Sequence, residues 1–169
     1  ACFQVRFSPI PNALIFNIVT IFLMLTAYFI ANYVAEATEH RMRLIMRAYT
    51  AVAVISAIIG TLAYLRLMPG ADIFLRYDRA KAAFKDPNVY GPFLVLPAMY
   101  ALQRVLLASG RTAVIAACIY LILFVGVFVS FSRAAWGHFA GSSLVVLVLC
   151  FWLEAAARDK VRIMIMSLV

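Results

Sequence analysis

Charged residues are scarce in this chain of 169 residues: they make up 13% of it, against about a quarter of an ordinary soluble domain. Acidic residues are especially few, with seven Asp and Glu against 15 Lys and Arg, and apolar residues fill 66% of the sequence. A soluble domain of this length cannot bury so much apolar surface, because small domains leave much of their surface in water. The composition therefore excludes a soluble globular domain, a disordered segment and a nucleic-acid-binding module, and it indicates that lipid surrounds most of the chain.

Cysteine is also scarce, and its three positions show no metal-binding or redox spacing. Cys118 and Cys150 lie inside apolar runs, so we expect both to be small buried hydrophobic residues. No basic segment or small-residue cleavage site follows Ala1, and an apolar run begins at 162–169. We therefore expect the chain to be a piece of a larger membrane protein that ends in the start of a sixth helix.

Five segments carry no charged residue and are long enough to cross a bilayer. A helix needs about 20 residues to span a hydrocarbon core of ~30 Å, within a range of about 17–25. Because lipid offers the backbone no hydrogen bonds, these segments must be helical. The prediction is an all-α, polytopic helical membrane protein, with one transmembrane domain over 1–169. Its helices are predicted at 12–34, 45–67, 89–108, 112–131 and 134–153.

Three features mark the third and fifth predicted helices. Pro92 suits a first helical turn, where its missing N–H has no partner, whereas Pro97 lies deeper and should kink the helix. Gly137 and Gly141 form a GxxxG pattern, which lets another helix approach closely. His138 lies between these glycines, and we expect it to be a buried, packed helix residue rather than a catalytic group.

Lys and Arg residues divide almost equally between the two membrane faces, so charge orients the chain only weakly. The face with loop 35–44 and turn 104–111 receives one basic residue more, which favours it as cytoplasmic. The opposite face, expected to be periplasmic, holds the long external loop 68–88. That loop is rich in basic residues against the usual bias of external loops, which indicates a function for them.

Two segments on this external face form the candidate site. The tight turn 130–136 holds Arg133 at the membrane boundary, where an ionisable residue is a functional candidate or, alternatively, an anchor that snorkels to the headgroups. In the long loop, Asp86-Pro87-Asn88 has the chemistry of a turn and helix N-cap, which would hold the loop against the third helix. The alternative for the loop is a solvated connector with internal ion pairs, such as Asp78 with Arg79 or Lys81.

Arginine is suited to gripping phosphate oxygens through two parallel hydrogen bonds. Basic residues gathered from both segments would therefore form a cradle for a lipid phosphate or diphosphate. The candidate members of this cradle are Arg76, Arg79, Lys81, Lys85 and Arg133.

The same residues resemble two motifs of the bacterial O-antigen ligase and polymerase family. The stretch from Arg79 through Phe84 and Asp86-Pro87-Asn88 to Gly91 is similar to its R-x-x-x-x-F-x-D-P-N-x-x-G pattern. The segment from Ser132-Arg133 to Trp136 is similar to its S-R-(G/A)-x-(W/L) pattern. The resemblance covers most of the chain, but only part of a family member with its ten or more helices.

The resemblance implies a metal-independent glycan transferase of the bacterial inner membrane that uses no cofactor. Such an enzyme takes a saccharide from undecaprenyl diphosphate at the periplasmic face. A ligase passes the saccharide to a lipid A–core sugar or a similar acceptor, and a polymerase passes it to another lipid-linked repeat. Arg133 and Arg79 match the arginines expected to hold the donor diphosphate, and Arg76, Lys81 and Lys85 join them by proximity. The residues expected to shape the site are Asp86, Pro87, Asn88 and Ser132.

One expected element of the family is missing from this sequence. The family's catalytic His lies in a later external loop, so the catalytic group is unknown here and we expect this chain alone to be inactive. Other possibilities stay open: an O-antigen or exopolysaccharide polymerase, a transporter or channel fragment, and a structural membrane subunit. A transport path is disfavoured, because the charge-free segments that would cross the lipid core contain no Asp, Glu, Lys or Arg to line it.

Overall fold

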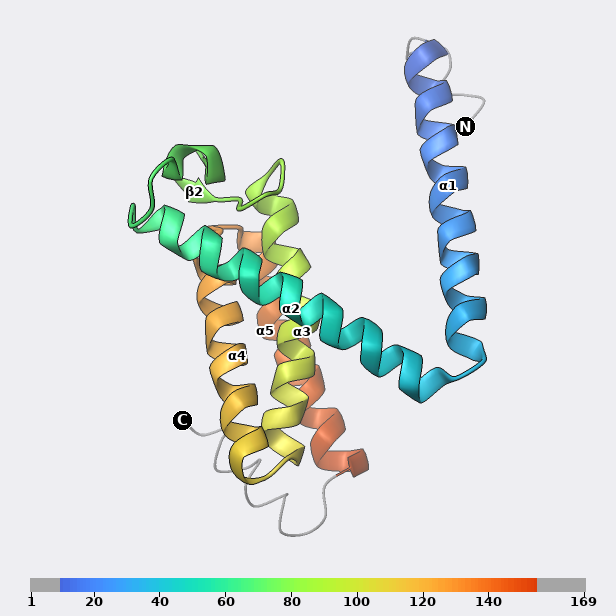
Figure 1. The fold of residues 1–169 in the computed structure, drawn as a ribbon, viewed down its shortest axis with the longest axis vertical. Coiled ribbons are helices and arrows are strands. Elements are labelled where there is room, and N and C mark those ends of the chain that lie inside the picture. The colour runs from blue at the N-terminus through green and yellow to red at the C-terminus, as the bar shows by residue number, and fades with distance from the viewer. Residues whose placement is uncertain (1–9, 155–169) are drawn as a thin grey trace. The chain divides into compact units, whose positions relative to one another are not determined.

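The computed structural model describes residues 10–154 and confirms the all-α prediction. Its five long helices are each apolar and long enough to cross a membrane (Figure 1). They are α1 (Ile10–Ala35), α2 (Thr38–Tyr64), α3 (Pro87–Leu107), α4 (Gly110–Val129) and α5 (Arg133–Leu149), which a π-helical turn (Cys150–Glu154) extends. By helix length and hydropathy the chain is a multi-pass membrane protein. The predicted start of a sixth helix at 162–169 lies outside the described residues.

The chain forms two compact units that divide within α2, Ala1–Ile45 and Met46–Val169. In the first unit, α1 exposes nearly all its large apolar side chains, as a helix surrounded by lipid must. Arg41 orders the connection that follows: its Nη2 lies 2.6 Å from Glu36 Oε2, and its guanidinium lies over the Tyr33 ring at 4.2 Å.

The predicted bounds of the second helix, 45–67, were wrong at both ends. α2 begins at Thr38, because charged residues at the membrane boundary also favour a helix, and Glu39 and Arg43 pair across one turn at 3.6 Å. It ends at Tyr64, since Arg66 adopts a left-handed φ of 57°. The Leu67 N–H then bonds Leu62 O at 2.9 Å, which closes the helix end.

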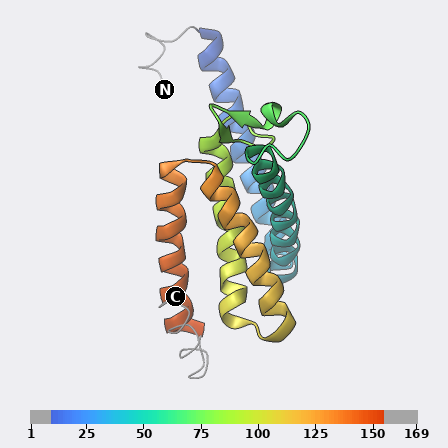
Figure 2. The ribbon, with the colours of Figure 1, turned by 90° about the vertical axis from the view of Figure 1, so that its left-hand side faces the viewer.

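In the second unit, α3 is the central helix. It packs along both α4 and α5, which make few contacts with each other, and it continues through Pro92 and Pro97 (Figure 2). The part of α2 from Met46 onward runs obliquely across α3 and α4 (Figure 1).

Small residues allow this oblique crossing to be close. A Cβ at Gly60 would lie 2.5 Å from Tyr90 Oη, and a Cβ at Gly126 would lie 2.8 Å from both Ala57 Cβ and Leu94 Cδ1. Tyr90 and Leu94 are themselves fully buried. Because lipid is as apolar as the side chains, tight van der Waals packing of this kind is what holds membrane helices together.

The long loop folds into a 3₁₀ turn (Ala71–Phe74) and a short antiparallel ribbon, β1 (Leu75–Arg76) and β2 (Arg79–Ala80). Tyr77 and Asp78 connect the strands with φ values of 53° and 55°, the pattern of a type I′ hairpin turn. This ribbon was not predicted, because its turn lacks the usual Asn-Gly signal and its strands have two residues each. β2 contacts both α3 and α4, so the ribbon lies at one end of the bundle (Figure 1).

Two predictions of burial were wrong. α5 turns Ala135 and Phe139 inward, so His138 lies on another side of the helix and is exposed. Cys118 is exposed as well, because it follows the buried Ala116 by two positions and so lies across α4 from it, whereas Cys150 is buried as expected. A Cβ at Gly137 or Gly141 would meet no atom within 4 Å, so no helix among the described residues uses the GxxxG face.

Candidate functional site

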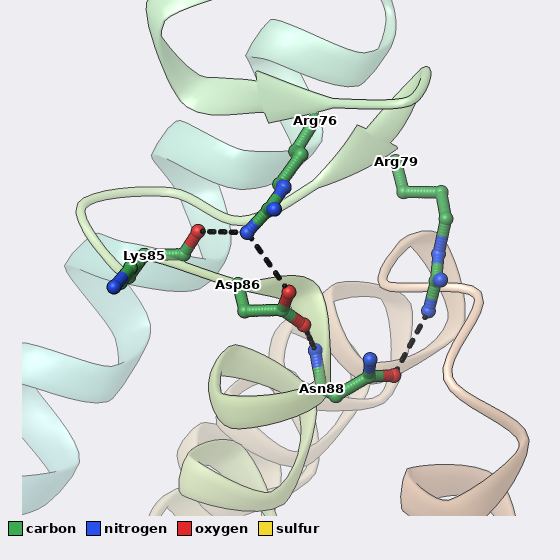
Figure 3. Close-up of polar contacts among 5 residues, drawn as sticks. All are labelled: Arg76, Arg79, Lys85, Asp86 and Asn88. Atoms are coloured by element: carbon green, nitrogen blue, oxygen red, sulfur yellow. Dashed lines mark hydrogen bonds and ion pairs between the residues drawn. The ribbon is translucent and has the colours of Figure 1, made fainter. Parts of the chain in front are cut away.

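The start of α3 confirms the predicted Asp86-Pro87-Asn88 cap. Asp86 is the N-cap residue: its Oδ1 accepts a hydrogen bond from the Asn88 N–H at 2.8 Å, and Pro87 occupies the first helical position. Arg76 from β1 reinforces this turn, donating from Nη1 to Asp86 Oδ2 at 3.1 Å and to Lys85 O at 3.2 Å (Figure 3). The ribbon is thereby attached to the α3 cap.

Arg79 joins the two segments that were predicted to share a membrane face. Its Nε donates to Ser130 O at 2.9 Å, and its Nη2 donates to Asn88 Oδ1 at 3.2 Å. The side chain therefore reaches from the ribbon to the start of α3 and to the turn between α4 and α5, as Figure 3 shows for its reach to Asn88. The structure confirms that the long loop and this turn lie together.

The turn between α4 and α5 is held by its own side chains. Ser130 is completely buried; its hydroxyl donates to Val127 O at 2.7 Å and accepts from the Ser132 N–H at 3.3 Å. Ser132 caps α5 by accepting from the Ala135 N–H at 3.3 Å, and Phe131 between them has a left-handed φ of 47°. These bonds fix the place from which Arg133 leaves the turn.

Arg133 is the first residue of α5, and its side chain is exposed. Within residues 10–154 its guanidinium makes no hydrogen bond or ion pair, so all its donors are available to a ligand. Its position after a capped, buried turn limits where the side chain can reach. Of the predicted cradle, Arg79 bonds to the α4–α5 turn and Arg133 directly follows it.

The other three predicted members are arranged differently. Arg76 is paired with Asp86, and the Lys81 ammonium donates to Ile73 O at 2.7 Å. Lys85 is exposed, and its side chain points away from Arg79 (Figure 3). Within residues 10–154, none of the three side chains makes a hydrogen bond or ion pair to the α4–α5 turn.

The acidic residues of the loop neutralise only part of its positive charge. Arg66 bridges Asp72 and Asp78, and Arg76 pairs with Asp86, so Asp78 pairs with neither Arg79 nor Lys81 as the connector alternative suggested. Within the part of the chain that the structure describes, four basic side chains at this end have no acidic partner. They are Arg79, Lys81, Lys85 and Arg133.

Sequence reasoning did not single out Ser130 or the aromatic cluster beside it. Trp136 stacks on Phe128 with ring centroids 5.3 Å apart and planes at 8°, and its Nε1 donates to Val127 O at 3.2 Å. Phe131 packs between Trp136 and Tyr64, at 6.0 and 5.6 Å. The two serines around Phe131 are the sequence signal for such a turn, since serine hydroxyls bond nearby backbone groups.

The arrangement has the chemistry of an oxyanion site. Among residues 10–154 no group of three or more His, Cys, Asp or Glu residues could hold a metal ion. Comparison with protein families, with curated proteins and with solved structures finds no match for this chain. Arg79 is bonded to the buried α4–α5 turn, and Arg133 begins the helix that follows it. Both lack acidic partners among the described residues, and guanidinium groups are suited to bind phosphate oxygens.

Proposed function

We propose that this chain belongs to a membrane glycan transferase of the O-antigen ligase kind. The enzyme moves a saccharide from undecaprenyl diphosphate to a lipid A–core or similar acceptor at the periplasmic face of the bacterial inner membrane. One observation carries the proposal: the Arg79–Ser130 hydrogen bond, between residues 51 positions apart, joins the R-x-x-x-x-F-x-D-P-N-x-x-G stretch to the turn that leads into the S-R-A-A-W stretch. Each stretch resembles a motif of that family, and their contact supports a shared role.

Arg79 and Arg133 bind the donor diphosphate in this proposal. Arg79 uses two of its five N–H donors on Ser130 and Asn88, which leaves the others for a phosphate oxygen. Arg133 contributes a guanidinium with no partner among the described residues. The bonds to Ser130 and Asn88 position Arg79 before the donor arrives, and Arg133 leaves the capped turn that Arg79 contacts.

Positioned cations favour the reaction at the step that breaks the glycosyl bond. When the acceptor hydroxyl attacks the anomeric carbon, the bond from that carbon to the diphosphate oxygen breaks, and negative charge accumulates on the departing lipid diphosphate. Arginines that meet this charge stabilise the transition state more than the bound substrate, which raises the rate. The hydroxyl proton passes to a base that we expect elsewhere in the intact protein.

The remaining predicted residues have supporting roles. The α3 cap consists of Asp86, Pro87 and Asn88, and the Asn88 side chain accepts a hydrogen bond from Arg79. Ser132 caps α5, the helix that begins with Arg133. Arg76 holds the ribbon to the cap through Asp86. Lys81 and Lys85 raise the positive potential around the diphosphate without gripping it.

Complementation tests the proposal. The intact gene that encodes this chain is placed in a bacterial strain lacking its own O-antigen ligase, and lipopolysaccharide is separated on a gel. Wild type should restore the ladder, Arg79→Ala and Arg133→Ala should abolish it, and Arg133→Lys should lose most of it, since lysine cannot form two parallel bonds. Arg43→Ala is the matched control, because Arg43 is exposed and belongs to the face predicted to be cytoplasmic. A ladder that survives both alanine variants, at equal membrane expression, would contradict the diphosphate site.

A polymerase of the same family is the alternative, and the acceptor distinguishes the two. A purified intact protein that extends one lipid-linked repeat with another, and that leaves lipid A–core unmodified, would be a polymerase. The roles of Arg79 and Arg133 are the same in both reactions, because both use a lipid diphosphate donor.

A further inference from the structure

A small cavity lies toward the opposite end of α3 from the Asp86 cap. It has a volume of about 130 Å³ and opens between α2, α3 and α4. Its walls combine an arginine and three hydroxyl side chains with apolar residues of α4. The lining consists of Thr50, Tyr100, Ala101, Arg104, Thr112, Ile115, Ala116 and Ile119.

The cavity is separate from the proposed diphosphate site. Asp86 and Asn88 lie at the beginning of α3, and Arg104 lies in its last turn. A helix rises ~1.5 Å per residue, so Pro87 and Arg104 are about 25 Å apart along α3, close to the ~30 Å thickness of the hydrocarbon core. Arg104 and the cavity mouth therefore belong to the opposite membrane boundary.

Arg104 is a half-buried cation without an anion. Its guanidinium lies over the Tyr100 ring at 5.8 Å, and within residues 10–154 its side chain makes no hydrogen bond or ion pair. A charged group beside apolar walls is costly to leave without partners, so the site favours a ligand that accepts several hydrogen bonds. Tyr100 and Thr112 line the same space, and the hydroxyl of each is a donor that such a ligand can use.

The size of the cavity limits what it can hold. At about 130 Å³ it exceeds the ~30 Å³ share of a water molecule, and it is smaller than the roughly 300–1,000 Å³ of pockets for drug-sized ligands. A phosphate group fits this range and a glycan does not. Ile115 and Ile119 line one wall, and Ile115 is half exposed, so an acyl chain can continue from the cavity along α4.

We propose that this cavity binds the phosphate group of an anionic membrane lipid in the leaflet opposite the diphosphate site. Arg104 donates hydrogen bonds to two phosphate oxygens, and the Tyr100 and Thr112 hydroxyls donate to the same phosphate. The acyl chains of the lipid lie against α4. A free phosphate ion has the same binding chemistry but gains nothing from the apolar wall.

Lipid retention tests this site. The chain is reconstituted in phosphatidylcholine nanodiscs that contain phosphatidylglycerol, extracted in mild detergent, and analysed by native mass spectrometry for bound lipid. Wild type should retain one phosphatidylglycerol in preference to phosphatidylcholine. Arg104→Ala should lower that retention about tenfold, the usual scale for losing a hydrogen bond to a charged group. Thr112→Val, which keeps the arginine and the helix, should lower it by a smaller factor.

Arg111→Ala is the matched control. Arg111 carries the same charge at the same boundary, but it is exposed and does not line the cavity. Equal losses in Arg104→Ala and Arg111→Ala would show general attraction of anionic lipid to basic side chains and would overturn the proposal. Unchanged retention in Arg104→Ala would show that Arg104 only snorkels to the headgroups, and would overturn it as well.

A second experiment distinguishes a lipid phosphate group from free inorganic phosphate as the ligand of the cavity. Inorganic phosphate at millimolar concentration is added to the protein in pure phosphatidylcholine nanodiscs, and binding is followed by phosphorus NMR. Weak binding that phosphatidylglycerol displaces would support the lipid, whereas phosphate binding that lipid fails to displace would overturn the lipid assignment. Arg79→Ala and Arg133→Ala should leave phosphatidylglycerol retention unchanged, so this proposal stands or fails independently of the diphosphate site.

Discussion

The side chain of Arg79 reaches the main chain of Ser130: its Nε lies 2.9 Å from the Ser130 oxygen, although 51 positions separate the two residues. Ser130 is fully buried, and its hydroxyl is hydrogen-bonded to Val127 O and to the Ser132 N–H. Its main-chain oxygen is therefore a fixed acceptor for Arg79. The ribbon of the long loop is thereby attached to the turn that precedes Arg133. The long loop is therefore held against the α4–α5 turn and is not a free, solvated connector.

Removing this anchor should free the ribbon. Arg79→Ala deletes the bonds to Ser130 and Asn88, and each hydrogen bond of a charged group contributes about 1.5–3 kcal/mol. We expect chymotrypsin to cut at Tyr77, which is 80% exposed in the hairpin turn, at least about tenfold faster than in wild type, since cleavage follows the population of the open loop. Lys85→Ala is the control, because its side chain anchors nothing among the described residues. Identical cleavage of Arg79→Ala and wild type would show that the two bonds do not hold the ribbon.

Two substitutions of Asp86 distinguish the contribution of its capping hydrogen bond from that of its ion pair with Arg76. Asp86→Ala removes both the bond to the Asn88 N–H and the pair with Arg76, and it should lower the free energy of unfolding by about 1–2 kcal/mol. Asp86→Asn keeps a capping oxygen, so it should cost less than half as much, because the partly exposed ion pair contributes little. Denaturant unfolding in detergent, followed by tryptophan fluorescence, measures both. Equal losses in the two variants would assign the stability to the ion pair instead.

Gly91 should not tolerate a side chain. A Cβ there would lie 2.7 Å from Ala135 Cβ and 2.8 Å from Ser130 Oγ, so Gly91→Ala should cost about 1–3 kcal/mol through overpacking. Gly137→Ala is the matched control within a helix: its Cβ meets no atom, and stability should stay the same or rise slightly. Adding Ala135→Gly to Gly91→Ala should recover part of the loss. If Gly91→Ala unfolds at the same denaturant concentration as wild type, α3 and α5 are not in contact at this point.

The two ends of α3 should lie on opposite sides of the membrane. Tyr77 precedes α3 and Ser109 follows it, and both are exposed. In a background without the native cysteines, Tyr77→Cys should react with a membrane-impermeant maleimide in cells whose inner membrane is intact. Ser109→Cys should react only after that membrane is permeabilised. Reaction of both from one side would show that α3 does not span, and the reverse pattern would place the arginine site in the cytoplasm.

Counting charge-free residues located four of the five helices to within about two residues at their starts, because the thickness of the lipid core sets the length of each apolar run. The charge-free run does not predict the start of α2, because the first turns of this helix contain Glu39, Arg43 and Arg47 and are nevertheless helical. Lipid excludes charge from the membrane interior, but it does not end a helix at the membrane boundary. The ribbon at Leu75–Ala80 was missed because tertiary contacts of Arg76 and Arg79, rather than local turn propensity, hold it.

The apolar helices and the Asp86 cap follow from the amino-acid sequence alone, since the helices depend on the lipid and the cap on residues close in the chain. Which arginines lack an acidic partner depends on the packing of distant segments: Arg76 is paired with Asp86, Arg79 bonds to two segments, and Arg133 is unpaired among the described residues. The tertiary structure also turned His138 and Cys118 outward, against expectation. These features depend on the rotation of each helix about its axis and on contacts between distant residues, and nearly uniform apolar runs contain little information on either.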